Sequence, residues 1–392
     1  MQKYLIVNTG SVSAKYSIYS QDKELFFGHY EIEAGQPIVS FFGNGRGGTL
    51  RTEKTSQEVF NNSLDHFIEE SIKAKIINNK DDIIAIGIRV VAPGKFFQSD
   101  RVVDDAFISQ ITDQKEEAPR HVPLTLEEIT EIKKIFPTTK IVAISDSAYH
   151  KNKPDFSKYY AIPKKVSDDL DLMSFGYHGI SLGSIVAKLA EEGRVPSKLV
   201  VCHLGGGSSI LAIKDGKSFN TSMGFTPMQG VVMSTRVGDI DPVAVMCLGQ
   251  KLNKNITELE AYFNNECGLL GLSGKSSDVR DLLLLEEQGN NDAKLALEKL
   301  VMSIKKYIGG FSAEMGGLDE IVFTGTIGER SYPMRERICK NMEYLGVKIN
   351  YKKNKKLFGV DGVISTIFSK VKVRIICTNE MDDMAKRLIN FN

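Results

Sequence analysis

The chain has 392 residues, 42% of them hydrophobic, and its 50 basic and 49 acidic residues give a formal net charge of +1. This balance excludes the broad positive field with which proteins bind nucleic acids or anionic membranes, so we expect small molecules and other protein chains as partners. The five cysteines form no C-x-x-C pair and no apolar run approaches the roughly 18 residues of a membrane span, so we expect an unexported, cytoplasmic protein without disulfides or a zinc site.

Short apolar runs alternate along the chain with stretches of helical periodicity, which predicts an α/β fold. After an opening strand at 3–8, strands are expected at 83–91, 140–144, 198–202, 320–324 and 373–377, and helices around 60–72, 129–136 and 297–308. Polar or glycine-bearing turns follow several of these strands, at Asn8, Asp146, His203 and Gly325. Because α/β sheets bind ligands beyond the carboxyl ends of their strands, the functional groups should gather there.

Two hairpin segments share one layout. "KYLIVNTGSVSAKYSIYSQDKEL" at 3–25 and "KLVVCHLGGGSSILAIKDGKSF" at 198–219 each run from an apolar strand through a Gly/Ser turn into a second strand and a polar turn. Backbone N–H groups in such turns bind anions, so the repeat predicts two similar α/β domains with a phosphate-binding turn on each side of a cleft, as in actin-like phosphotransferases. Two unrelated hairpins are the alternative.

Two other nucleotide-binding patterns fail. "GLLGLSGKS" at 268–276 resembles a P-loop, but Leu269 occupies the position of the first required glycine, and a helix-like segment precedes it instead of a strand. The glycines at 205–207 do not continue as G-x-G-x-x-G because Ile210 replaces the last glycine. A dinucleotide-binding fold is therefore only weakly supported.

Several histidines and arginines lie where they can contact an anion. His121, His150, His178 and His203 all lie in polar or small-residue turns, and none has the spacing of a metal site. Arg89 lies in an apolar strand and Arg236 among small residues and two aspartates. An arginine keeps its charge when buried, so each requires a carboxylate or phosphate partner. Structural hydrogen bonds and structural salt bridges are the alternatives for these residues.

The chain resembles the acetate and propionate kinase family essentially from end to end. The motifs that carry the resemblance are N-x-G-S-x-S-x-K at 8–15, R-V-V at 89–91, A-P-x-H-x-P at 118–123, D-[ST]-A-[FY]-H at 146–150, G-[FY]-H-G at 176–179, H-L-G-x-G at 203–207, "NTSMGFTP" and T-R-x-G-D-I-D-P at 220–242, "GLLGLSGKSSDVRD" at 268–281, "FTGTIGER" at 323–330 and "TNE" at 378–380. Butyrate kinases share the opening hairpin and lack the blocks around 224–242 and 268–281.

The resemblance implies two duplicated actin-like (ribonuclease-H-like) domains with an ATP cleft between them. The first would span 1–145, bind the acyl substrate and be joined by 377–392; the second would span 146–376 and bind the nucleotide. The implied activity is direct, in-line and reversible transfer of the γ-phosphoryl of ATP to acetate, giving ADP and acetyl phosphate, a precursor of acetyl-CoA. Mg²⁺ is the implied metal, with Mn²⁺ as a substitute. A homodimer is implied as well, and the apolar helix at 295–308 is compatible with it.

The resemblance also assigns roles to residues. Arg89 and Arg236 would bind the carboxylate and, with His178, offset charge on the transferring phosphoryl, and Asp146 is the fourth catalytic candidate. The remaining expected contacts are Val91, His121, Tyr177 and Pro227 for the acyl group; Asn8 and Glu380, with Asp146, for the metal; and Lys15, His203, Leu204, Gly205, Gly206, Gly207, Asp278, Val279, Arg280, Thr326, Ile327, Gly328, Glu329 and Arg330 for ATP. We expect an electrostatic role for Asp146, because acetate is already ionised at pH 7 and needs no base.

The chain departs from the usual family pattern at several positions. They are Val12, Ala92-Pro93-Gly94, Met173-Ser174, Gly206, Thr326 and Arg330, where we expect effects on rate or affinity, and Arg120, where the family has leucine in the acyl pocket. Arg120 either lines that pocket and alters substrate choice or points to solvent. A propionate- or butyrate-type kinase, or a kinase of another short-chain carboxylate, is thus the alternative. An actin-like protein without phosphotransfer would keep the glycine turns but not Arg89, Arg236 and His178 together.

Overall fold

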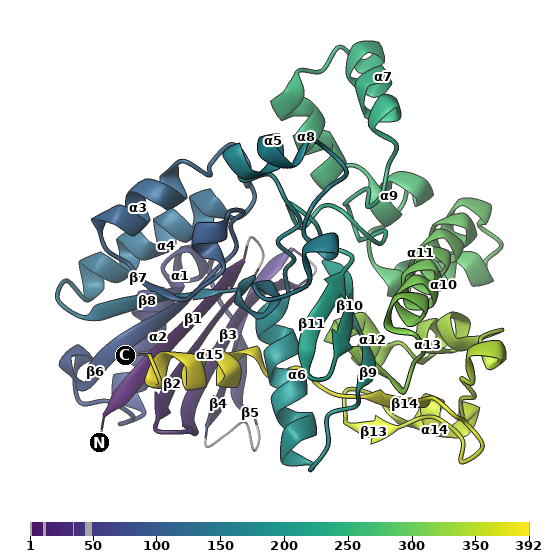
Figure 1. Cartoon of the computed structure of the whole chain (residues 1–392). Helices are drawn as coiled ribbons and strands as arrows, with labels where there is room; N and C mark the ends of the chain where they lie inside the picture. Colours follow the sequence, from purple (N-terminus) through teal and green to yellow (C-terminus); the bar gives the residue numbers. More distant parts are fainter. Residues whose placement is uncertain (1, 11–12, 34, 44–48, 392) are drawn as a thin grey trace. The chain divides into compact units, whose positions relative to one another are not determined.

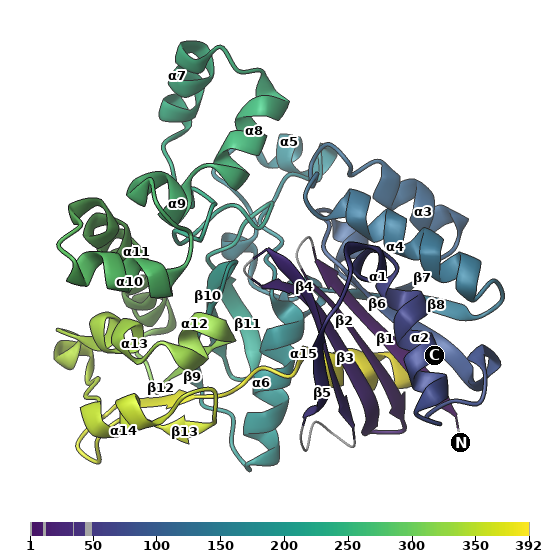
Figure 2. The ribbon, with the colours of Figure 1, turned by 180° about the vertical axis from the view of Figure 1, so that it is seen from behind.

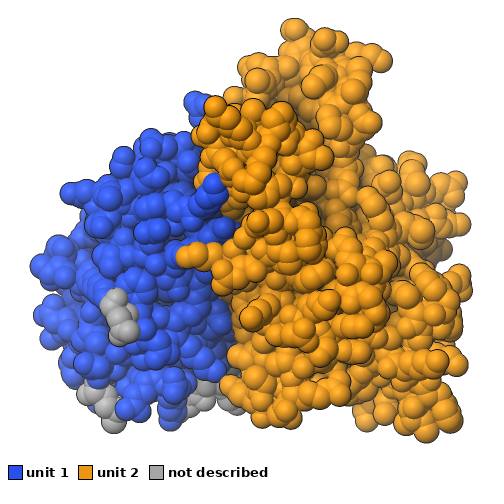
Figure 3. Space-filling view, viewed as in Figure 1, with its two compact units in different colours: residues 1–148, 379–392 blue, residues 149–378 orange. Residues whose placement is uncertain are grey.

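The computed structural model describes residues 2–10, 13–33, 35–43 and 49–391, without the side chains of Glu33 and Thr49. The chain divides into two compact units (Figure 3). Unit 1 comprises Met1–Ala148 and Asn379–Asn392, and unit 2 comprises Tyr149–Thr378. None of the described helices combines the length and apolar character that crossing a membrane requires.

Unit 1 is built on an eight-stranded sheet with the order β5-β4-β3-β2-β1-β6-β8-β7 (Figures 1 and 2). Its strands are β1 (Lys3–Gly10), β2 (Ser13–Ser20), β3 (Lys23–Glu33), β4 (Gln36–Gly43), β5 (Thr49–Lys54), β6 (Ile83–Val90), β7 (Arg101–Val102) and β8 (Lys140–Ser145). Its helices are α1 (Gln57–Asn61), α2 (Ser63–Lys73), α3 (Asp105–Thr112), α4 (Val122–Ile135) and α15 (Glu380–Ile389). Strands β1, β6 and β8 are parallel, and the other pairings are antiparallel.

Helices cover both faces of the parallel strands of unit 1. Leu5 and Val7 of β1 belong to the core cluster that includes Phe67 of α2 and Ile129 of α4. On the other face, α15 contacts β1, β6 and β8, and a Cβ added at Gly87 would lie 3.4 Å from Leu388 of α15. Buried parallel strands require such cover on both sides.

Unit 2 is built on a six-stranded sheet with the order β11-β10-β9-β12-β14-β13 (Figure 1). Its strands are β9 (Lys198–Leu204), β10 (Ser208–Lys214), β11 (Lys217–Thr221), β12 (Glu320–Thr324), β13 (Gly362–Val363) and β14 (Lys372–Ile375). Its helices are α5 (Lys164–Asp169), α6 (Gly179–Glu191), α7 (Pro242–Leu252), α8 (Ile256–Asn265), α9 (Gly268–Ser273), α10 (Val279–Glu287), α11 (Asn291–Met315), α12 (Gly325–Arg330), α13 (Tyr332–Cys339) and α14 (Tyr351–Lys356).

The sheet of unit 2 separates two apolar clusters. Val200 and Cys202 of β9 pack in the cluster of α11, whereas Val201, which points to the opposite face of the same strand, packs in the cluster of α6. The predicted apolar helix at 297–308 lies within α11, and its residues Leu297 and Ile304 are buried in this core. That face of the helix is therefore not available to a partner chain.

The two units repeat one topology. The order β3-β2-β1-β6-β8-β7 in unit 1 corresponds to β11-β10-β9-β12-β14-β13 in unit 2, with the same parallel and antiparallel pairings. Strands β4 and β5 extend the sheet of unit 1 alone. Each half also ends in the same way: after β8 the chain enters unit 2, where α6 covers the sheet, and after β14 it returns to unit 1, where α15 does so. The predicted duplication is confirmed.

Candidate active site

The parallel strands of unit 1 bring three of the predicted site residues together. Asn8 belongs to β1, Arg89 to β6, and Asp146 directly follows β8. The register pairs Val7 with Ile88 and Arg89 with Ile144, so the carboxyl ends of the three strands are neighbours. This edge of the sheet is where α/β proteins place ligand-binding groups.

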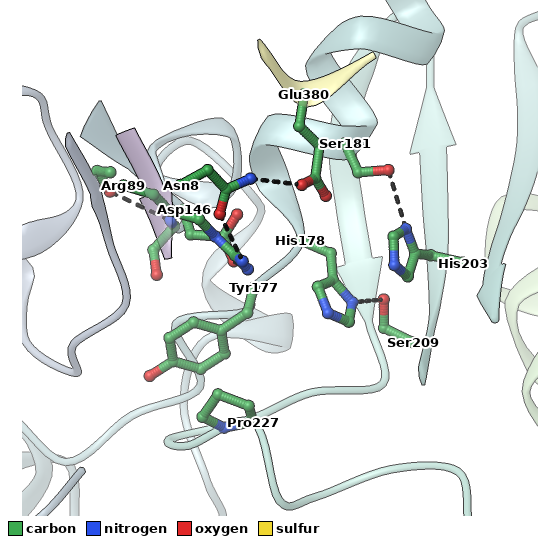
Figure 4. A network of polar contacts seen from close by, with 12 residues as sticks. Asn8, Arg89, Asp146, Tyr177, His178, Ser181, His203, Ser209, Pro227 and Glu380 are labelled. Carbon is green, nitrogen blue, oxygen red and sulfur yellow. Dashed lines mark hydrogen bonds and ion pairs between the residues drawn. The ribbon is translucent and has the colours of Figure 1, made fainter. Parts of the chain in front are cut away.

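A chain of polar contacts links these residues (Figure 4). Arg89 Nη2 donates to Asp146 Oδ2 at 3.0 Å, Arg89 Nη1 lies 3.5 Å from Asn8 Oδ1, and Asn8 Nδ2 donates to Glu380 Oε2 at 3.0 Å. Burial alone lowers the pKa of Arg89, but the charges of Asp146 and Glu380 outweigh it and raise that pKa above its ordinary value. Arg89 Nε is buried and has no hydrogen-bond partner among the described residues. This N–H group is therefore left unsatisfied among the described residues.

Helix α15 is anchored so that its first residue, Glu380, lies at the carboxyl ends of the parallel strands, where it contacts Asn8. Arg387 in its last turn donates to Ser145 O at 2.9 Å and from Nε to Asp100 Oδ2 at 2.9 Å. Asp100 in turn accepts from the backbone N–H of Ser145 at 2.9 Å. The same ion pair thus fixes the end of β8, which carries Asp146, and the helix that carries Glu380.

The other predicted residues of unit 1 have less defined roles. Lys15 pairs with Asn8 across strands β1 and β2, next to the metal candidates. Val91 is buried directly after β6, and His121 precedes helix α4. Arg120 is half-buried, and burial lowers its pKa from the ordinary value. Ser11 and Val12 of the first Gly/Ser turn lie outside the described residues.

In unit 2, His178 and Arg236 converge on the second Gly/Ser turn. A Cβ added at Gly207 would lie 3.4 Å from Arg236 Nη1 and 3.6 Å from His178 Nε2. His178 adopts a left-handed conformation with φ of 61°, which residues other than glycine rarely do. Its Nδ1 lies 2.9 Å from Ser209 Oγ, and its ring stacks on that of His203 with centroids 4.1 Å apart. The strained backbone is consistent with a functional role for His178.

Tyr177 and Pro227 are held by the same loop region of unit 2. The Tyr177 hydroxyl donates to Phe225 O at 2.5 Å, and Arg236 Nη1 donates to Pro227 O at 3.1 Å. His150 is fully buried, with its ring nitrogens 2.7 Å from Ser218 Oγ and 3.1 Å from Tyr177 O. His150 therefore has the structural hydrogen-bonding role, since both of its ring nitrogens have hydrogen-bond partners within unit 2.

Two of the segments that the resemblance assigns to ATP, 203–207 and 326–330, are adjacent. Strands β9 and β12 pair in parallel, which places His203 beside Thr324. Gly325 has φ of +75°, and an added Cβ would lie only 2.7 Å from Leu204 O, so only glycine fits there. Helix α12 therefore begins directly against the turn at 203–207.

Within helix α12, Glu329 makes internal contacts. Its Oε1 accepts from Thr324 Oγ1 at 3.3 Å, from Gly325 N at 2.9 Å and from Thr378 N at 3.1 Å. Thr326 and Arg330, by contrast, are exposed on this helix.

The third nucleotide segment begins helix α10. Asp278 caps this helix by accepting from Arg280 N at 2.7 Å, and it forms an ion pair with the exposed Arg280 at 2.6 Å. Val279 between them is buried. The P-loop-like stretch before this segment is the short helix α9, which follows helix α8 and not a strand, as expected from the missing glycine.

Sequence reasoning did not single out the residues that hold the site residues in place. These are Asp100 and Arg387 in unit 1 and Ser181, Ser209 and Thr378 in unit 2. The only sequence signal among them was the "TNE" motif, which contains Thr378. The others are common polar residues whose partners are far away in the sequence.

The oxygen donors of unit 1 suit a hard cation. No group of three His, Cys, Asp or Glu residues that could enclose a metal ion occurs in the described parts of the chain. Mg²⁺, however, is usually held by one or two carboxylates together with substrate phosphates and water. Asp146, Glu380 and the amide oxygen of Asn8 fit that donor set.

Comparison with known proteins identifies the family. The sequence model of the Acetokinase family matches residues 3–386. An acetate kinase from Clostridium acetobutylicum is 37% identical over 392 residues, which cover 96% of each chain. Among solved structures, a propionate kinase from Francisella tularensis has a TM-score of 0.87 at 30% identity over 100% of both chains, and the Porphyromonas gingivalis acetate kinase has a TM-score of 0.84 at 29% identity over 99% of both. These matches confirm the predicted pair of actin-like domains, and the chain belongs to the acetokinase family.

Proposed function

We propose that this protein transfers the γ-phosphoryl group of ATP reversibly to acetate, forming acetyl phosphate and ADP. The observation that carries the proposal is Arg89, whose guanidinium is held by Asp146 at 3.0 Å while its buried Nε has no partner among the described residues. A buried, positively charged donor of this kind suits the carboxylate of a small acid. Membership of the acetokinase family supports the same substrate class.

The residues of both units suit a phosphoryl transfer with little covalent chemistry. The transition state spreads negative charge over the equatorial oxygens of the transferring group, so fixed cationic and N–H donors lower the barrier. Arg236 and His178, which both lie next to Gly207, would supply them from unit 2, and Arg89 from unit 1. Acetate is ionised at pH 7, so Asp146 would act by orienting Arg89 instead of accepting a proton.

ATP would be bound by unit 2 and the acyl group mainly by unit 1. The turn at 203–207 and the start of α12 offer backbone N–H groups to phosphates, while the segment at 278–280 would contact the nucleoside. Lys15 would reach a phosphate from unit 1. Val91, His121, Tyr177 and Pro227 would contact the acetate. The domain assignments 1–145 with 377–392 and 146–376 belong to this proposal.

Asn8, Asp146 and Glu380 would hold Mg²⁺, or Mn²⁺ in its place. When bound, the cation neutralises phosphate charge. The Asn8–Glu380 hydrogen bond of 3.0 Å orients both side chains before it binds. We further propose a cytoplasmic homodimer in which acetyl phosphate serves acetyl-CoA formation. The net charge of +1 gives no support for nucleic acid or membranes as partners.

A larger acyl substrate is the second candidate. It is favoured by Arg120, which stands where the family has leucine in the acyl pocket, and by the similarity to a propionate kinase structure. We place acetate first because Val91 in unit 1 and Tyr177 and Pro227 in unit 2, the residues expected to contact the acyl group, are each buried and mostly apolar.

The test is formation of acyl phosphate, trapped as the hydroxamate, from ATP and a panel of carboxylates, with and without Mg²⁺. We expect product with acetate at the highest kcat/KM, only with ATP and metal present. The reverse reaction, ATP formation from ADP and acetyl phosphate, provides a second readout. Absence of product with every carboxylate would refute the proposal, and a clear preference for propionate or succinate would favour the second candidate.

A further inference from the structure

A line of hydrogen bonds in unit 2 ends at the ring of His203. Thr378 Oγ1 donates to Ser181 Oγ at 2.9 Å, and Ser181 Oγ lies 2.9 Å from His203 Nδ1 (the second contact is drawn in Figure 4). Ser181 belongs to the first turn of α6, and Thr378 is the last residue of unit 2. Three parts of the chain that are distant in sequence thus meet at one imidazole.

The number of hydroxyl protons determines which group donates in each of these hydrogen bonds. A hydroxyl carries one proton and donates one hydrogen bond. Thr378 Oγ1 donates its single proton to Ser181 Oγ at 2.9 Å. Its contact with Ser184 Oγ is longer, at 3.2 Å, and Ser184 Oγ already donates to Ser181 O at 2.7 Å. Ser181, which accepts from Thr378, keeps its own proton for His203 Nδ1.

The backbone holds Thr378 in the orientation that this requires. Its N–H donates to Glu329 Oε1 at 3.1 Å, and the same oxygen accepts from Gly325 N at 2.9 Å. Since Thr324 pairs with His203 across β12 and β9, the contacts close a ring through Glu329, Thr378, Ser181 and His203. These contacts hold the backbone of Thr378, and its hydroxyl lies 2.9 Å from Ser181 Oγ.

We infer that Ser181 and Thr378 are positioning residues that fix His203 as the neutral tautomer with its proton on Nε2. A histidine whose Nδ1 accepts a hydrogen bond carries the proton on Nε2, so it offers an N–H donor to a phosphate oxygen. The opposite tautomer would present a lone pair and repel the phosphate. This assignment rests on the proposed function insofar as the ligand is ATP.

The stacking of His178 on His203 favours the same state. The two ring centroids are 4.1 Å apart with an interplanar angle of 27°. Two imidazolium ions at that distance repel each other, which disfavours charge on both rings. A neutral His203 avoids that repulsion.

The test compares Thr378→Val, which removes the donor and keeps the side-chain shape, with Thr378→Ser, which keeps the hydroxyl. Thr366→Val is the matched control, because the Thr366 hydroxyl has no hydrogen-bond partner among the described residues. Ser181→Ala removes the direct donor to His203 and serves if Thr378→Val does not fold. Long-range ¹H–¹⁵N correlation spectra of ¹⁵N-histidine-labelled protein report the tautomer of each of the six histidines. The signals that are missing in His203→Gln identify those of His203.

We expect the Nε2–H pattern of His203 in the wild type, Thr378→Ser and Thr366→Val, and its loss in Thr378→Val and Ser181→Ala. The KM for ATP should rise roughly tenfold in the last two variants, as for loss of one hydrogen bond to a charged group. An unchanged His203 spectrum in Thr378→Val and Ser181→Ala would overturn the inference, even if KM rises. If the wild type is inactive but Thr378→Val and Ser181→Ala lose the Nε2–H pattern that the wild type shows, the proposed function is refuted and the positioning role is supported.

Discussion

Asp146 is almost fully buried, with 1% of its side chain exposed, and Arg89 is its ion-pair partner at 3.0 Å. The pair holds the guanidinium at the end of the parallel strands, and Arg89 Nε has no hydrogen-bond partner among the described residues. A buried carboxylate that loses its cationic partner costs stability as well as activity. Under the proposed function, Arg89 therefore serves both the fold, through this ion pair, and the reaction.

Substitution of the two arginines should reduce catalysis strongly. We expect Arg89→Ala and Arg236→Ala each to lower kcat by about 10²–10³-fold, because each charge acts mainly on the transition state. Arg89→Ala should also lower the melting temperature, since it leaves Asp146 buried without its partner. Arg194→Ala, at an exposed arginine, is the control. Turnover near that of the wild type in either variant would remove that arginine from the site.

The metal dependence should respond to Glu380. Mg²⁺ keeps few protein ligands, so we expect Glu380→Ala to raise the Mg²⁺ concentration for half-maximal activity by about tenfold or more. Titration of activity with Mg²⁺ at saturating ATP measures this, with Glu287→Ala at an exposed glutamate as the control. An identical Mg²⁺ titration in wild type and Glu380→Ala would contradict the assignment of Glu380 as a metal ligand.

The fold was largely predictable, whereas the supporting contacts of the site were not. The strand at 83–90, the helix around 297–308 and the two repeated hairpins follow from apolar periodicity, which is local in the sequence. Local patterns also placed Asp146 and His203 at strand ends. The Arg387–Asp100 pair and the Thr378–Ser181 bond join residues 287 and 197 positions apart, and no local pattern specifies such partners.

Stability should depend on pH through Lys153. This lysine is 1% exposed, donates to Ser174 Oγ at 2.9 Å, and burial lowers its pKa from 10.5 to about 7. Between these two values the unfolded chain binds the proton and the folded chain does not, so stability rises with pH. We expect Lys153→Met to be more stable than the wild type by several degrees in melting temperature at pH 7, and less so at pH 9.

The control for this prediction is Lys165→Met, at an exposed position of α5. Thermal unfolding between pH 6 and pH 10 compares the three proteins. A difference between wild type and Lys153→Met that stays constant over this range would show that the ammonium is not the source of the effect.

The acyl preference should not depend on Arg120. Its half-buried side chain has a long apolar stem that can cover apolar surface while the guanidinium reaches water or an acidic group. We therefore expect wild type and Arg120→Leu to share the order acetate, propionate, succinate in kcat/KM. If the wild type prefers succinate and Arg120→Leu prefers acetate, Arg120 lines the pocket and recognises a second carboxylate.

The return of helix α15 to unit 1 has a consequence for how the protein folds. Unit 2 is one continuous stretch, 149–378, whereas unit 1 needs its last helix from the end of the chain. Met381, Met384 and Leu388 of α15 are buried, and the Asn8–Glu380 bond spans 372 residues. Contacts of such long range form late because closing the loop costs chain entropy, so a ribosome-bound chain can complete unit 2 before unit 1. The metal candidates Asn8 and Glu380 then meet only after residue 380 has left the ribosome, so a shorter nascent chain cannot form this contact.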